Sequence, residues 1–165
     1  MNTRDLVPTL TTLFAELVTG AQETSYVLNR GDLGLLRSLD KLSAADASRA
    51  ATGATIAAHV DHLRYGLSLM NRWAAGEDPW RDADWMASWR ITTVSEPEWT
   101  ALRAKLRAEA QRLLAIFGSP REVTTIELNG MAGAIAHLAY HLGAIRQIHR
   151  AASGPKESNA PSSIG

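Results

Sequence analysis

Two histidines four residues apart, His137 and His141, are the side chains in this sequence best placed to do chemistry. An α helix puts residues at this spacing on one face, one turn apart, so their imidazoles can bind one metal ion. Around the pair, apolar residues recur at helical steps, at Met131, Ile135, Leu138, Leu142 and Ile145. We therefore expect the pair on a helix, at the edge of its buried stripe.

Two further histidines, His59 and His62, lie in a second segment with helical periodicity, residues 55–75. On a helical wheel His59 points near the centre of the apolar stripe and His62 to its flank, so either could reach the interior. Two ligands from one helix and one from the other would leave a coordination position open for water or substrate, as in catalytic sites. Imidazole nitrogens suit a divalent ion, with zinc or nickel expected before manganese or iron.

Four long amphipathic helices are expected to position these side chains. They are predicted over residues 6–29, 55–75 and 95–117, and from the turn-like Leu128-Asn129-Gly130 to about residue 152. A short helix or apolar plug is predicted over residues 33–39, and a tryptophan-rich connection over 77–93, where Pro79 argues against one continuous helix. The sequence therefore predicts an all-α four-helix bundle with a long connection between helices two and three.

Composition restricts the partners and the chemistry. The 165 residues match one domain, expected over residues 1–152, and a flexible tail rich in Ser, Pro and Gly over 153–165. Lys plus Arg and Asp plus Glu balance at 17 each, so neither nucleic acid nor a membrane is expected as partner. The absence of cysteine excludes disulfides, thiolate ligands and a cysteine nucleophile. No signal peptide or membrane span is recognisable, so a cytoplasmic location is expected.

The five tryptophans cluster between the end of the second helix and the start of the third, at Trp73, Trp80, Trp85, Trp89 and Trp99. They could form the wall of a pocket beside a metal or an interface patch, although packing in the core and loops is the more common use of such residues. On the helical wheel Asp61, Arg64 and Tyr65 face solvent, so we do not expect them in catalysis.

The histidine pattern resembles that of the DinB-like superfamily of four-helix bundles, which includes metal-dependent hydrolases and thiol-dependent S-transferases. The family has an Ile-x-x-x-x-x-His-Leu segment in helix two, which Ile56 and His62-Leu63 match, and a His-x-x-x-His pair in the last helix, which His137 and His141 match. Near Gly143 and Gln147 the chain departs from the family's His-Arg-Gly-Gln type sequence, since Leu142 replaces the arginine and Ala144 the glutamine.

The resemblance implies the metal ligands His62, His137 and His141, with His59 as the alternative to His62. It also implies a homodimer that acts on a small-molecule substrate, either by metal-dependent hydrolysis or by S-transfer with a low-molecular-weight thiol as cosubstrate. No catalytic residue beyond the ligands is predicted. The alternative is a non-catalytic dimeric bundle that binds a hydrophobic ligand or partner near the tryptophans.

Overall fold

A computed structural model of the chain describes residues 3–51, 53–119 and 122–156. These residues form six α helices and two short 3-10 helices and contain no β strand, which confirms the predicted all-α class. The long helices are α1 (Thr3–Thr19), α4 (Ile56–Ala74), α5 (Glu96–Phe117) and α6 (Thr125–Ile148). The short ones are α2 (Gly34–Leu39), α3 (Ala44–Ala47), η1 (Ser88–Arg90) and η2 (Arg150–Ala152).

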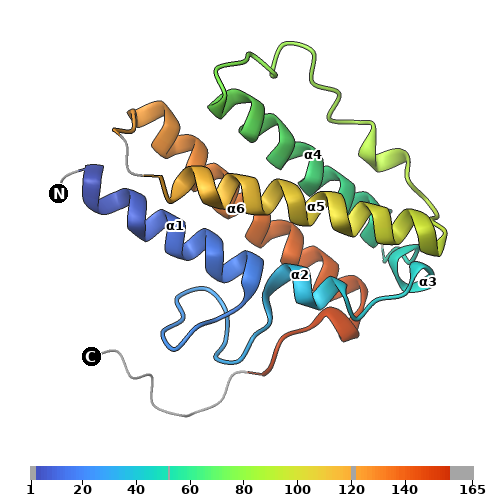
Figure 1. Cartoon of the computed structure of the whole chain (residues 1–165). Helices are drawn as coiled ribbons and strands as arrows, with labels where there is room; N and C mark the ends of the chain where they lie inside the picture. Colours follow the sequence, from blue (N-terminus) through green and yellow to red (C-terminus); the bar gives the residue numbers. More distant parts are fainter. Residues whose placement is uncertain (1–2, 52, 120–121, 157–165) are drawn as a thin grey trace.

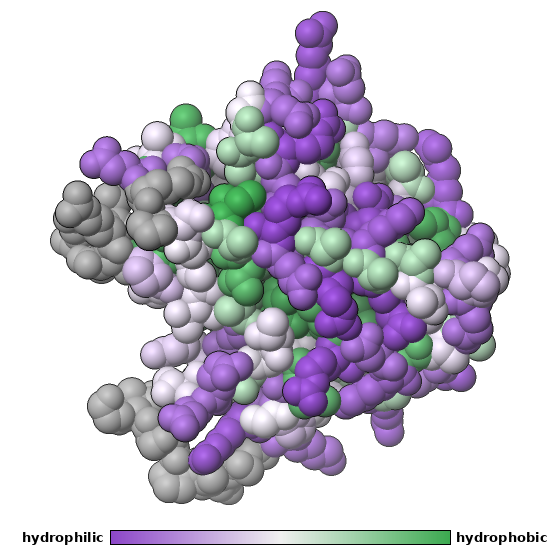
Figure 2. Space-filling model, in the orientation of Figure 1, coloured by the Kyte–Doolittle hydropathy of each residue, from purple (hydrophilic) through white to green (hydrophobic). Residues whose placement is uncertain are grey.

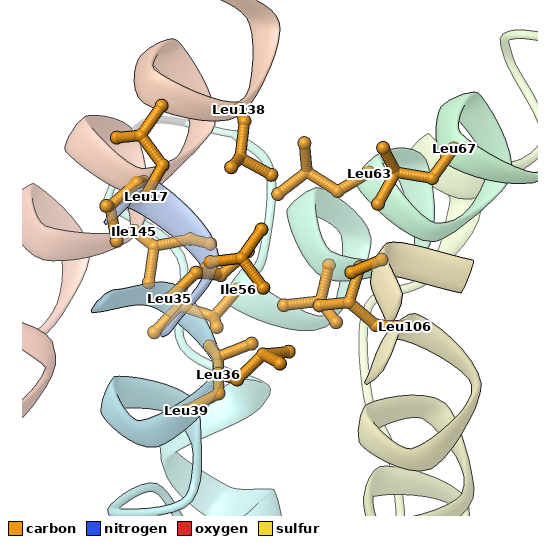
Figure 3. Close-up of a cluster of buried hydrophobic side chains, with 14 of the residues drawn as sticks. Leu17, Leu35, Leu36, Leu39, Ile56, Leu63, Leu67, Leu106, Leu138 and Ile145 are labelled. Carbon is orange, nitrogen blue, oxygen red and sulfur yellow. The ribbon is translucent and has the colours of Figure 1, made fainter. Parts of the chain in front are cut away.

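The long helices lie side by side, and α1 and α4 each pack against both α5 and α6 (Figure 1). Apolar side chains from these helices and from α2 meet in one core, part of which Figure 3 shows around Ile56, Leu106 and Ile145. Burying each such side chain stabilises the fold by roughly 1.5–3 kcal/mol. Hydrophilic side chains cover most of the face seen in Figure 2.

The first helix ends at Thr19, well before the predicted end at residue 29. Gly20 follows with φ +106°, and a Cβ at this position would lie 2.5 Å from the backbone oxygen of Asp32. The buried carboxylate of Glu16 then accepts hydrogen bonds of 2.7–3.1 Å from three consecutive backbone N–H groups, those of Tyr26, Val27 and Leu28. These bonds fold the following loop over the end of the helix, so the prediction for residues 20–29 was wrong.

The last helix begins before the turn that was predicted at residues 128–130. Thr124 and Glu127 form a capping box, in which the glutamate carboxylate accepts the backbone N–H of Thr124 at 2.7 Å and its hydroxyl at 2.9 Å. Gly130 lies inside the helix, and Trp73 packs against it: a Cβ there would be 2.9 Å from the Trp73 ring. The glycine therefore serves a close helix–side chain contact and not a turn.

The end of the described chain lies against the loop between α1 and α2. The Asn29 side chain donates to the backbone oxygen of Pro155 at 2.9 Å, and Arg146 forms a 2.7 Å ion pair with the buried Asp32 nearby. Residues 157–165 of the predicted tail lie outside the described residues. In the described part of the chain, no helix combines the length and the apolar character needed to cross a membrane.

Candidate metal centre

Helices α4 and α6 carry the four clustered histidines. The Thr55 hydroxyl caps α4 by accepting the backbone N–H of Ala58 at 3.1 Å, which sets where the helix begins and hence the direction of His59 and His62. Along α6, His137 and His141 lie one turn apart, as their spacing predicted. Because α4 packs against α6, the two helices bring these side chains together.

The Nε2 atoms of three histidines converge at one point. The distance from His62 Nε2 to His137 Nε2 is 3.0 Å, and that from His137 Nε2 to His141 Nε2 is 2.9 Å. All three candidate ligand atoms lie within 4.8 Å of one another. His62 and His141 are buried and His137 is half-buried. The three predicted ligands are thus close enough to bind one metal ion.

His59 takes a different place from the triad. Its Nδ1 lies 2.9 Å from Nδ1 of His141, which is the nitrogen on the far side of that ring from the convergence point. The helical wheel placed His59 more centrally than His62, yet the structure leaves His59 partly exposed and buries His62 to 8 % exposure. His62 therefore belongs to the group of three converging nitrogens, and His59 contacts that group only through the outer nitrogen of His141.

The nitrogens fit the dimensions of an imidazole-bound metal. With metal–nitrogen bonds of 2.0–2.1 Å and a tetrahedral angle, ligand nitrogens lie about 3.3 Å apart. The His62–His137 and His137–His141 pairs, at 3.0 and 2.9 Å, would need to separate by only a few tenths of an ångström. Ligation through Nε2 would put the proton of each ring on Nδ1, and His141 would then donate to His59. The buried Nδ1 of His62, which has no hydrogen-bond partner among the described residues, would then carry the proton.

Burial keeps these imidazoles in the neutral form that binds metals. Desolvation, followed by the nearby histidines, lowers the pKa of His62 to about 4 and that of His141 to about 3. Desolvation also lowers the pKa values of His59 and His137. At neutral pH the cluster therefore offers lone pairs instead of positive charges, and a metal ion does not have to displace the protons of an imidazolium.

Tryptophan rings from the connection between α4 and α5 pack against two members of the triad, His62 and His141. The Trp89 ring centroid lies 4.5 Å from that of His62 and 6.0 Å from that of His141. The Trp85 ring lies 5.6 Å from His62, again between centroids. Trp99, in contrast, is fully buried in the core and donates its indole N–H to the backbone oxygen of Leu42 at 2.8 Å. Trp85 and Trp89 thus lie at the site, and Trp99 lies in the core.

Side chains of α4 hold the connection between α4 and α5 in place through hydrogen bonds. The Asp61 carboxylate accepts the hydroxyl of Ser88 at 2.6 Å, and the hydroxyl oxygen of Tyr65 accepts the backbone N–H of Asp84 at 3.0 Å. Asp61 and Tyr65 were expected to face solvent, but they are half-buried beneath the connection. Sequence reasoning missed their role, which is to hold Trp85 and Trp89 over the histidines.

A largely apolar pocket of about 520 Å³ opens beside the triad. His62 and His137 form part of its wall, and the rest comes from α4, α6 and the connection: Leu63, Gly66, Leu67, Met70, Trp73, Trp80, Trp85, Ile126, Gly130, Gly133 and Ala134. Three of the five tryptophans therefore line a pocket next to the metal-binding geometry, which is one of the uses predicted for them.

Comparisons of the chain with protein-family models, with curated proteins and with solved structures found no match. What the site does must therefore be inferred from its own geometry.

Proposed function

We propose that this protein binds a divalent metal ion through His62, His137 and His141. The convergence of their three Nε2 atoms beside a pocket is the observation that supports this function. Three protein ligands leave a coordination position for a substrate, as in catalytic sites. All three are imidazoles, so zinc or nickel is proposed as the ion, with manganese or iron as alternatives.

The remaining residues of the site have supporting roles in this proposal. His59 orients the His141 ring by accepting its Nδ1 proton. Trp89 lies over His62 and His141 and keeps bulk water from them. When bound, a divalent ion supplies Lewis acidity, which lowers the pKa of a water or a thiol. Since the chain has no cysteine, a thiol would come from a low-molecular-weight cosubstrate.

We further propose that the chain is a DinB-like four-helix bundle and a metal-dependent hydrolase or thiol-dependent S-transferase for small molecules. The matching positions of its three histidines and the packing of its four long helices support this. A cytoplasmic homodimer is part of the same proposal. Sedimentation analysis tests the homodimer.

Metal analysis of untagged protein tests the central proposal. After loading and desalting, we expect about one zinc or nickel ion per chain by elemental analysis. His62→Ala should abolish binding, whereas His59→Ala should weaken it by about 10- to 100-fold, as is usual for partners of metal ligands. His149→Gln is the control, because His149 pairs with Asp46 away from the cluster. Absence of stoichiometric metal in the unaltered protein would overturn the proposal.

A non-catalytic protein that binds a hydrophobic ligand is the second candidate function. It is favoured by one observation, the apolar pocket lined by Trp73, Trp80 and Trp85. The two candidates differ in their need for metal. If metal-free protein binds apolar ligands while stoichiometric metal binding is never seen, the second candidate replaces the first.

A further inference from the structure

The pocket beside the triad is polar at one end and apolar along the rest of its wall. At one end lie the imidazoles of His62 and His137, and the other lining side chains are aliphatic or aromatic. Among the described residues that line the pocket there is no Asp, Glu, Lys or Arg. A charged group placed in such surroundings would lose hydration without gaining a partner of opposite charge. The lining therefore selects a neutral ligand whose polar end, if it has one, lies at the histidines.

Aromatic faces shape the outer part of the pocket. The Trp80 and Trp85 rings stack with an interplanar angle of 13° and a centroid distance of 6.3 Å, and Trp73 meets the edge of Trp80 at the same distance. Trp80 and Trp85 are 41 % and 39 % exposed, so these rings lie where the pocket meets solvent. Ring faces of this kind favour flat aromatic ligands by offset or edge-to-face contact.

Glycines on the two helices keep the space open. A Cβ at Gly66 would lie 3.5 Å from Cε1 of His137, so a larger side chain there would stand between the pocket and the imidazole. At Gly133 of α6 a Cβ would meet nothing within 4 Å, although this residue lines the pocket. The pocket volume of about 520 Å³ is within the range of small-molecule sites.

We propose that this pocket binds a neutral aromatic small molecule, with its ring system among Trp73, Trp80 and Trp85 and its polar end at His62 and His137. The inference names the substrate class of the proposed metal site, and it rests on the proposed function only for the role of that polar end. Binding of the aromatic part depends on the pocket lining alone.

Calorimetric titration of metal-free protein with 2-naphthol tests the proposal, and 2-naphthoate, its anionic counterpart with the same rings, serves as the comparison. We expect saturable binding of the naphthol and at least about ten-fold weaker binding of the naphthoate, because the carboxylate would lose its hydration. Failure of the naphthol to bind, or equal affinity for the two compounds, would overturn the proposal.

A pair of glycine variants on the same helix locates the ligand. Gly133→Leu places a side chain in the pocket and should weaken naphthol binding by about ten-fold or more. Gly143→Leu is the matched control, since a Cβ there also meets nothing within 4 Å but Gly143 does not line the pocket. Both changes improve helix propensity by a similar amount. Equal effects of the two variants, or no effect of either, would refute the location.

A tryptophan variant and the metal assay distinguish failure of this inference from failure of the proposed function. Trp80→Ala removes a half-exposed ring outside the core and should weaken naphthol binding while leaving metal stoichiometry unchanged. If naphthol binds but no metal does, the proposed function fails and this inference stands. If metal binds but naphthol does not, this inference fails and the proposed function stands.

Discussion

Acid should destabilise the metal-free protein through its buried histidines. His62 and His141 are 8 % and 3 % exposed, and burial lowers their pKa values from 6.5 to about 4 and about 3 in the folded state. The unfolded chain therefore binds protons below pH 6.5 that the folded chain does not take up. Stability should be full above about pH 7 and be lost as the pH falls from 6.5 toward 4.

The size of the effect follows from proton linkage. At pH 5 an unfolded histidine is almost fully protonated, whereas a folded one with a pKa near 4 is mostly neutral. The difference lowers the free energy of unfolding by about 2 kcal/mol for each histidine, or about 4 kcal/mol for His62 and His141 together. This is a large part of the roughly 5–15 kcal/mol that stabilises a typical domain.

Urea unfolding between pH 8 and pH 5, in the presence of a chelator, measures this dependence. His62→Leu should remove about 2 kcal/mol of it. Leu102→Ala, which weakens core packing without removing a titratable group, should lower stability equally at both pH values. The pKa values of Asp46 and Glu98 are lowered by hydrogen bonds from Ser43 and Ser95, so these carboxyls act only below this pH range. A pH-independent free energy of unfolding would refute the reasoning.

Glu16→Ala should lower the free energy of unfolding by about 3 kcal/mol, because three loop N–H groups lose a charged acceptor. Glu16→Gln should lower it by less, and equal losses for the two variants in urea unfolding would contradict this. Ser88→Ala removes the hydrogen bond to α4 and should speed hydrogen exchange across residues 77–94 by about ten-fold relative to α5, and an unchanged ratio would show that other contacts hold the connection. Gly20→Ala should lower the free energy of unfolding by more than about 3 kcal/mol, through backbone strain and a clash with the backbone carbonyl of Asp32. Gly31→Ala, at φ +80° with open space around it, should lower it by only about 1–2 kcal/mol. Similar thermal denaturation of the two variants would count against the clash.

The middle helices could be predicted because local signals mark both of their ends. Helix α4 was expected over residues 55–75 and α5 over 95–117, and both lie within one residue of these limits. The Ser95 and Glu98 capping box begins α5, and Gly76, with φ +88°, follows the end of α4. Signals of this kind act between residues that are close in the chain, so the sequence alone contains them.

The end of α1 and the place of Gly130 inside α6 depend on contacts between distant residues. The start of α6, in contrast, has a local signal that the prediction missed, the Thr124 and Glu127 capping box. The apolar pattern of α1 continues through Val27, but the Glu16 carboxylate and the close approach of Gly20 to Asp32 end the helix first. In α6, Gly130 looks like a turn residue until the Trp73 ring is placed against it. Neither contact leaves a mark in the local periodicity.

The sequence predicted that His62, His137 and His141 lie together, but it did not predict the contacts of the connection between α4 and α5. His59 and His62 are three residues apart, so they differ by only about 60° around the helix axis, and the packing of α4 against α6 decides which one joins the pair. The route of the connection depends on Asp61 with Ser88 and on Tyr65 with Asp84, pairs separated by 27 and 19 residues. No spacing rule relates such pairs.

The packing of the tilted Trp85 and Trp89 rings against His62 also makes the site visible to optical spectroscopy. Indole emission responds to the charge and occupancy of a ring in contact with it, so events at His62 should change the fluorescence of these two residues. The near-parallel Trp80 and Trp85 rings should add a coupled near-ultraviolet dichroism band that changes when their spacing changes. The protein thus carries an intrinsic spectroscopic probe, with which occupancy of the site can be followed in real time without a label.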